Sequence, residues 1–206
     1  MSEIRVTNII GENGADAVNF SKGINISSGI VTATSFSGSG ANLTGLDPGI
    51  TNAQQFRLAA NQTGSNSNGT VFTNWQSTMT TYEAIGSNWS QSSGIFSCSA
   101  TGIYLCMWTM VISDTSTGDA FDPNIQISTD SGSNYTTRSR SWGHIQNSST
   151  ARDSPSAQFM FDVTNTSTFR LRFRQSQDND VASGTTIAGS TSENLTNIMF
   201  IRIGDT

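Results

Sequence analysis

Reactive side chains are scarce in this chain of 206 residues, which holds one histidine, His144, and two cysteines, Cys98 and Cys106. A metal site needs clustered histidine, cysteine or carboxylate ligands, and a catalytic nucleophile needs a base beside it. No motif ties His144 to a serine or cysteine, so we expect it to be a loop residue. Both cysteines are expected to be buried, reduced and inert. The sequence therefore predicts no catalytic residue, no metal site and no cofactor.

The cysteines raise one further question, because they lie symmetrically about Gly102 on opposite arms of an expected turn. This spacing leaves a cross-strand disulfide open. The first residues contain no basic region followed by an apolar stretch, so no signal peptide is predicted and synthesis in a cytoplasm is expected. A cytoplasmic origin argues against the disulfide, since thiols stay reduced there.

Carboxylates are scattered and mostly lie in turn-like contexts, such as Asp122 and Asp178. A glycosidase needs two carboxyl groups that face each other in a cleft, and the sequence shows no such pair. Residues 128–135 resemble a single Asp-box, the hairpin turn repeated in sialidase propellers. Turn chemistry alone explains that segment, because Asp130 can cap its own turn and Gly132 can adopt a positive φ. We expect a hairpin here rather than an enzyme site.

Arginines alternate with apolar residues in the segment from Phe169 to Arg174. The pattern predicts a strand with one buried face and one wet face that carries Arg170, Arg172 and Arg174, at an edge or in an outer sheet. Two interpretations remain open. The arginines either solvate the strand and prevent aggregation, or they contact other chains or acidic surface sugars.

A second group of residues combines aromatic faces with planar hydrogen-bond donors, the side chains that suit sugar rings and acidic groups. They are expected in loops and are the candidates for recognition of a receptor: Trp89, Arg138, Arg140, Trp142 and His144.

The overall composition excludes several classes of protein. Net charge is −5, and Lys22 is the only lysine, so nucleic-acid binding is not expected. No apolar run approaches the length of a membrane span. Charged residues make up 12% of the chain, and polar uncharged residues dominate. These values favour a largely uncharged, polar, β-rich chain.

Two compositional zones divide the chain. Residues 1–50 contain only short apolar pairs separated by Gly, Ser and Asn, so they must bury these groups against another chain or stay mobile. We expect a docking segment at 1–22, a short β-stalk at 23–50 and a domain at 51–206. About ten strands with polar turns predict an all-β sandwich or barrel. The expected strands are 56–60, 71–72, 80–85, 94–99, 103–113, 125–129, 135–142, 157–164, 168–175 and 194–203.

The segment 103–112 is apolar on both faces, and 194–203 has the same character. One face of a sandwich strand packs in the core, so the second face needs another cover, and another subunit is the simplest one. The residues expected in the subunit interface or the core are Tyr104, Trp108, Met110, Met199 and Phe200.

Residues 96–105 resemble the signature of the tumour-necrosis-factor-like jelly roll, most closely the globular heads of collagen-like complement proteins. The match includes Gly102 and Tyr104, while Thr101 stands where that family usually has proline. The resemblance covers about 54–206. It implies a ten-stranded jelly-roll sandwich that assembles as a homotrimer, with its inner sheets facing the three-fold axis.

The first fifty residues resemble N-terminal segments of tail-fibre and related structural proteins of bacteriophages, especially those of marine cyanobacteria. The resemblance lies in 8–14, 31–38 and 43–46. It implies a virion protein whose N-terminus docks on other virion proteins and whose C-terminal knob contacts a host surface glycan. Two alternatives remain: a head decoration or tail collar protein, and a polysaccharide-degrading enzyme.

The expected domain boundary can be tested by deleting residues 1–50. The remaining chain should stay folded and trimeric, because 51–206 contains all the long strands that the sequence predicts. Circular dichroism and gel filtration would measure both properties. Loss of folding on truncation would contradict the boundary.

Overall fold

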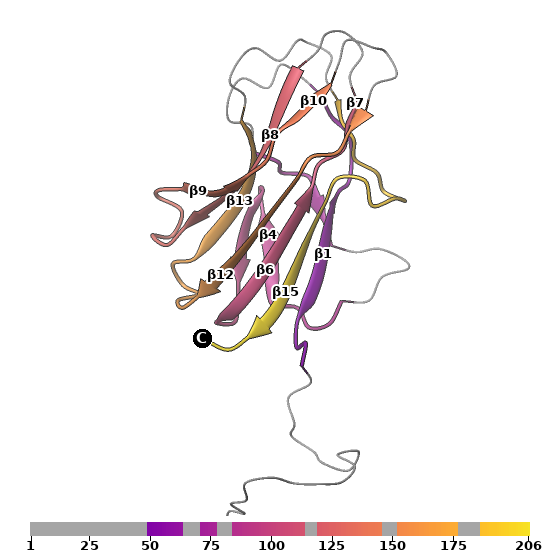
Figure 1. The fold of residues 1–206 in the computed structure, drawn as a ribbon. Helices are drawn as coiled ribbons and strands as arrows, with labels where there is room; N and C mark the ends of the chain where they lie inside the picture. Colours follow the sequence, from indigo (N-terminus) through magenta and orange to yellow (C-terminus); the bar gives the residue numbers. More distant parts are fainter. Residues whose placement is uncertain (1–48, 64–70, 78–83, 114–118, 146–151, 177–185) are drawn as a thin grey trace, which may run out of the picture. The chain divides into compact units, whose positions relative to one another are not determined.

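The computed structural model describes residues 49–63, 71–77, 84–113, 119–145, 152–176 and 186–206. Within these ranges all regular secondary structure is β-strand, and no helix is present (Figure 1). The expected docking segment at 1–22 lies outside the described residues, as does the expected stalk at 23–50 apart from Gly49 and Ile50.

Two larger antiparallel sheets form the fold. The first has the order β12 (Ser156–Val163), β6 (Gly102–Thr109), β15 (Asn197–Gly204), β1 (Ala53–Leu58) and β3 (Trp75–Gln76). The second has the order β10 (Gly143–Ile145), β8 (Asp119–Ser128), β13 (Arg170–Ser176), β5 (Ile95–Cys98) and β4 (Trp89–Ser92). The strand β9 (Thr136–Arg140) also pairs with β8.

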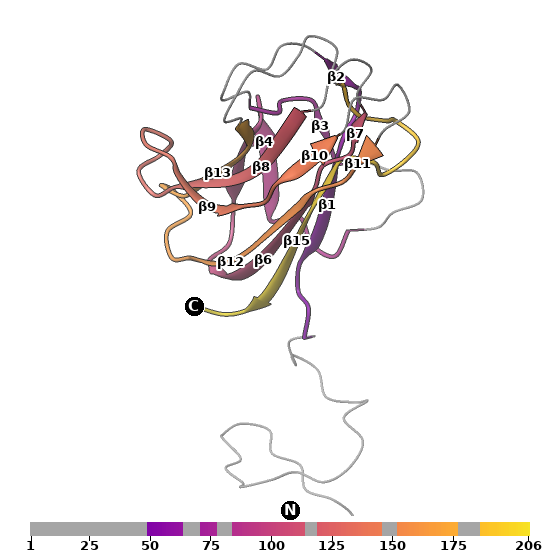
Figure 2. The same ribbon diagram turned by 45° about the horizontal axis from the view of Figure 1, so that its top comes forward.

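A small third sheet joins β11 (Arg152–Asp153), β7 (Ile112–Ser113), β14 (Thr186–Ile187) and β2 (Gln62–Thr63). Figure 2 shows β2, β7 and β11 at the end of the domain away from the C-terminus. Of the fifteen strands in the described ranges, five are only two residues long. The predicted all-β jelly-roll architecture is confirmed.

Several details differ from the sequence-based expectation. The strand β13 pairs with β8 on one side and β5 on the other, so of the two expected placements, at an edge or in an outer sheet, the edge is wrong. The strands β4 and β10 were not expected, because their short, polar sequences do not stand out. Of the expected strand at 80–85, residues 80–83 lie outside the described residues, and Ile85 forms an isolated bridge with Ala53.

The core lies between the two larger sheets and is rich in aromatic rings. On β6, Tyr104, Cys106 and Trp108 are fully buried, while the residues between them are half-buried. The ring of Trp108 meets that of Phe173 from β13 at 5.2 Å in an edge-to-face arrangement. Because such aromatic contacts bury large areas, they bind the first sheet to the second.

Trp89 belongs to this core. It is 3% exposed, and its ring stacks on Phe200 with centroids 4.1 Å apart. The expectation that Trp89 is an exposed loop residue is therefore wrong. Its position at the start of β4 brings it under the first sheet, which the local sequence does not reveal.

A buried amide holds β4 in place. Gln54 on β1 donates from Nε2 to the Trp89 carbonyl oxygen at 3.2 Å, and its Oε1 accepts from the Trp89 N–H at 2.6 Å. Asn52 donates to the same Oε1 at 3.2 Å. The Gln54 side chain thus replaces the backbone partner that β4 lacks, which satisfies groups that would be costly to bury unpaired.

Gly102 begins β6 with a φ of 143°, a region that favours glycine. A Cβ added there would lie 2.8 Å from the Gly204 carbonyl oxygen. Only glycine therefore lets β15 approach the start of β6 this closely. This is the physical reason for the glycine in the signature at 96–105.

The two tryptophans at positions 89 and 142 give a matched test of this fold. Trp89→Ala should lower the free energy of unfolding by about 3–5 kcal/mol, because it leaves a cavity against Phe200. Trp142, which is 63% exposed, serves as the control. Trp142→Ala should change stability by less than about 0.5 kcal/mol. Urea denaturation measures both values, and equal losses would contradict the placement of Trp89.

Candidate functional site

The register of the second sheet gathers polar side chains on its outer face. Arg140, Asn124 and Arg174 form one row across β9, β8 and β13. The next row contains Thr137, Gln126 and Arg172. Residues paired across neighbouring strands point to the same side of a sheet. We call this outer side of the sheet, with Tyr135, Arg140, Trp142, Arg172 and Arg174 and the buried amides Asn124 and Gln126 beneath them, the arginine face.

Arg172 is held at the centre of this face by two contacts. Its guanidinium lies 3.9 Å from the centre of the Tyr135 ring, and its Nε donates to Gln126 Oε1 at 2.8 Å. Gln126 in turn donates from Nε2 to Thr137 Oγ1 at 3.0 Å. Partial burial lowers the pKa of Arg172 and raises that of Tyr135.

A second arginine is fixed beside it. The Arg140 guanidinium lies 4.7 Å from the centre of the Trp142 ring, and its Nη1 is 3.8 Å from Asp122 Oδ2. Asp122 is only 2% exposed, whereas Trp142 is 63% exposed. The buried carboxylate thus anchors the arginine from below, while the indole stays at the surface.

Tyr135 is positioned by the turn between β8 and β9. Asp130 accepts hydrogen bonds from Ser128 Oγ at 2.6 Å and from the Asn134 N–H at 2.9 Å. These bonds lower the pKa of Asp130 to about 2. Gly132 adopts a φ of 91°. The predicted hairpin at 128–135 is therefore confirmed, and it has the turn chemistry expected of it.

The structure brings together residues that the sequence singled out separately. Arg140 and Trp142 share the arginine face with the arginines of β13. Arg138 lies at a bulge in β9 and is exposed, and His144 is exposed on β10. Of the five receptor candidates, Trp89 alone lies in the core, while Arg138 and His144 are exposed outside the arginine face.

Sequence reasoning missed Tyr135, Asn124 and Gln126 as members of this face. A signal for the last two was present, because polar residues alternate with apolar residues along β8. The sequence does not show that β8 separates β9 from β13, and that pairing is what makes these amides part of the face.

The first sheet carries a different outer surface. Met107 on β6 lies opposite Met199 on β15, and Leu105 lies opposite Ile201. Met160 on β12 joins the second row and is 60% exposed. We call these five residues, together with Ile103, the apolar face. Apart from Met160 their side chains are half-buried in the single chain.

The residues expected in the interface or core divide between two places. Tyr104, Trp108, Met110 and Phe200 have no exposed surface and lie in the core of the chain itself. Met199 lies on the apolar face. Strand alternation explains the division, since Met199 and Phe200 are neighbours and must point in opposite directions.

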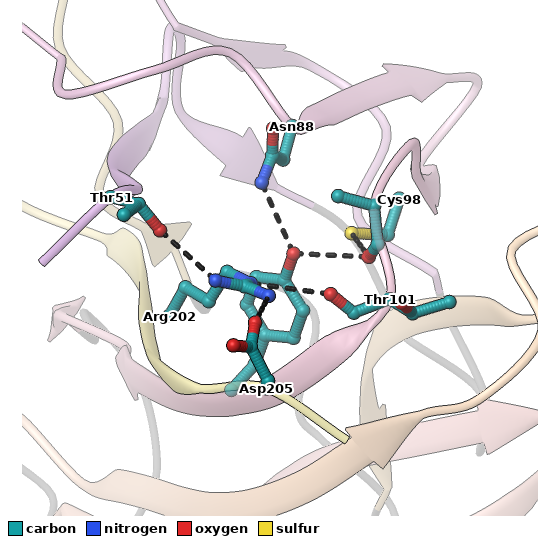
Figure 3. A network of polar contacts seen from close by, with 8 residues as sticks. Thr51, Asn88, Cys98, Thr101, Arg202 and Asp205 are labelled. Atoms are coloured by element: carbon teal, nitrogen blue, oxygen red, sulfur yellow. Dashed lines mark hydrogen bonds and ion pairs between the residues drawn. The ribbon is translucent and has the colours of Figure 1, made fainter. Parts of the chain in front are cut away.

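A network of polar contacts closes the end of the domain where the chain enters β1 (Figure 3). Arg202 donates to Thr51 Oγ1 at 3.2 Å and to the Thr101 carbonyl oxygen at 3.2 Å, and it pairs with Asp205. It thereby joins the entry segment, the turn before β6 and the C-terminal segment after β15. This cross-link fixes the base of the domain.

The Tyr104 hydroxyl forms the inner part of the same network (Figure 3). It donates to the Ala100 carbonyl oxygen at 3.1 Å and accepts from Asn88 Nδ2 at 3.2 Å. Burial, together with its contact to the Cys98 thiol, raises the pKa of Tyr104 to about 12. Burial also raises the pKa of both Cys98 and Cys106, which are unpaired thiols.

Among the described residues, no group of three or more His, Cys, Asp or Glu side chains could hold a metal ion. The described residues contain no helix that is long and apolar enough to cross a membrane.

No family model and no curated protein matches this chain. Among solved structures, murine APRIL at pH 8.5 superposes with a TM-score of 0.51 and 15% identity, over 73% of this chain and 98% of that one. Eiger TNF from S. frugiperda superposes with a TM-score of 0.51 and 12% identity, over 77% of this chain and 96% of that one. The vertex protein P5 of PRD1 has a TM-score of 0.45 and 19% identity, over 76% of this chain and 100% of that one. The first two show that the domain has the tumour-necrosis-factor-like jelly-roll fold.

The buried phenol gives a prediction about pH. Above about pH 10 the unfolded chain loses the Tyr104 proton while the folded chain keeps it, so the free energy of unfolding falls between about pH 10 and 12. Tyr104→Phe lacks this contribution and should decline less steeply over that range. At pH 7 it should be less stable by about 1 kcal/mol, because the Asn88 and Ala100 bonds are lost. Denaturation curves from pH 7 to 12 would measure this. Parallel declines in both proteins would contradict it.

Proposed function

We propose that this chain is a non-enzymatic virion protein of a bacteriophage, a trimeric fibre knob that attaches to a host cell-surface glycan. In this proposal 1–22 dock on other virion proteins, 23–50 form a trimeric stalk, and 51–206 form the knob. The chain is made in the host cytoplasm and functions in the assembled particle. The single observation that carries the proposal is the apolar face of the first sheet.

The apolar face argues for assembly because its side chains are apolar on two adjacent strands and on a third at Met160. A soluble domain gains nothing from such a surface unless a partner covers it. A further copy of the same chain is the occupant that we propose. The tumour-necrosis-factor-like fold supports this choice, because the resemblance at 96–105 implies three copies around one axis.

The bacteriophage context rests on the resemblance of residues 1–50 to tail-fibre proteins. The base network adds a physical argument, since Arg202 ties the entry at Thr51 to the last strand. In Figure 1 β1 starts near the C-terminus, and β7 and β10 lie at the opposite end of the domain. A knob tethered through Thr51 would therefore present β7 and β10 away from its tether.

Attachment would use multivalency. Three identical knobs on one fibre, and several fibres on one particle, turn weak contacts into strong ones when the sites can be engaged together. The exposed side chains of Arg138, Arg140, Trp142 and His144 have the chemistry for sugar contacts.

The trimer is tested by native mass spectrometry of the full chain. The expected mass is about 66 kDa, three times the 21.9 kDa of one chain. Met199→Glu and Leu105→Glu should each give a folded monomer, because they bury a charge in the interface. Ser90→Glu, at an exposed position on β4 of the second sheet, is the control and should remain trimeric. A monomeric wild-type chain would refute the proposal.

A further inference from the structure

We infer that the arginine face is a binding site for an anionic saccharide, one that carries carboxylate or sulfate groups. The inference rests on the proposed function only for the idea that the knob binds a glycan. It adds the chemical class of that glycan and the surface that binds it.

The first argument is the distribution of charge. The chain has ten cationic residues and a net charge of −5, yet five of the ten lie on β9 and β13: Arg138, Arg140, Arg170, Arg172 and Arg174. Alternate residues on a strand are about 7 Å apart, so like charges repel along β13. The proximity of Arg174 contributes to the lowered pKa of Arg172. An anionic ligand would relieve this repulsion.

The second argument is the exposed indole of Trp142. Arg140 covers one face of this ring, and 63% of the residue is still exposed. Most of the other ring face must therefore be open to solvent. An exposed tryptophan adds nothing to the core, but it offers a flat apolar platform for the C–H face of a sugar ring. The cation beside it suits an acidic group on the same sugar.

The third argument is that the guanidinium groups are fixed in place. Arg172 is held by Tyr135 and Gln126, and Arg140 is held by Trp142 and Asp122. An arginine whose only task is solvation would not need two partners. A fixed planar fork loses less conformational entropy when it binds a carboxylate or sulfate with two hydrogen bonds.

A saccharide fits this face better than a nucleic acid does. The amides Asn124 and Gln126 between the arginines are buried, and Gln126 is bonded to Arg172 and Thr137, so they position the arginines while Trp142 offers a sugar ring its exposed surface. The negative charge of the whole chain would repel a long phosphate backbone, whose binding depends on extended cationic surface.

The test measures binding of the full chain to four immobilised polymers by biolayer interferometry: polygalacturonate, dextran sulfate, neutral dextran and single-stranded poly(dT). Binding is expected for polygalacturonate, dextran sulfate or both. It should be absent for neutral dextran, weaker for poly(dT), and should weaken as salt rises.

Variants locate the site. Arg172→Gln and Trp142→Ala should each weaken binding about tenfold or more, since each removes a charged or aromatic contact. Arg140→Lys keeps the charge but loses the planar fork, and it should also bind more weakly. Lys22→Gln changes the net charge by the same amount as Arg172→Gln, lies outside the knob, and should bind as wild type. Circular dichroism and native mass confirm that each variant is folded and assembled.

Three results would overturn the inference. They are no binding to either anionic saccharide, equal binding by wild type and the arginine-face variants, and binding to poly(dT) as tight as to the saccharides. The trimer is judged separately by mass, so a trimer that binds no anionic saccharide refutes this inference alone. A monomer that binds through Arg172 and Trp142 refutes the trimer alone.

Discussion

The contact between Trp108 and Phe173 sets the two exposed surfaces of this domain. Trp108 lies near the end of β6 and Phe173 in the middle of β13, and the two buried rings point into the core from opposite sheets. Because side chains alternate along a strand, Met107 must then point out of the first sheet, and Arg172 and Arg174 must point out of the second. A slip of one residue in β13 would put its arginines in the core and Phe173 in water. The apolar face and the arginine face are thus consequences of the core packing.

The two faces suit two different tasks. The apolar face carries no described cation and joins methionine, leucine and isoleucine side chains across β12, β6 and β15, as an interface between copies requires. The arginine face holds its charges with buried partners and lies on the other sheet. The proposed assembly and the proposed recognition would therefore use different surfaces. The base network around Arg202 lies where the chain enters β1, apart from both of these tasks.

The core itself uses polar groups sparingly but specifically. The Gln54 amide gives β4 the backbone hydrogen bonds that no neighbouring strand supplies, and this positions Trp89 against Phe200. The Tyr104 hydroxyl, on the strand that follows the turn at Gly102, donates a hydrogen bond to the Ala100 carbonyl oxygen before that turn. The polar atoms of both side chains are hydrogen-bonded, so they favour a single arrangement of the strands around them.

Local alternation was sufficient to separate the two faces of β6, to assign the inner and outer residues of β13, and to predict the hairpin at 128–135 and the all-β class, because each depends on neighbours in the chain. It did not show which face of β6 lies in the core, since both faces are apolar. The tumour-necrosis-factor-like fold also followed from a short local signature, for which the close approach of Gly204 to Gly102 gives a reason.

The order in which the strands pair could not be predicted from local sequence. Trp89 was expected in a receptor loop because an aromatic ring suits a sugar, and only its contact with Phe200, over one hundred positions away, shows that it lies in the core. Likewise, the sequence left an edge position possible for β13, and the structure shows that β5 and β8 flank it. Arg140 and Arg174 lie in one row only because β8 pairs with both β9 and β13. Strand pairing joins distant segments through backbone groups that every residue shares, so the amino-acid pattern marks the face of a strand but not its neighbour.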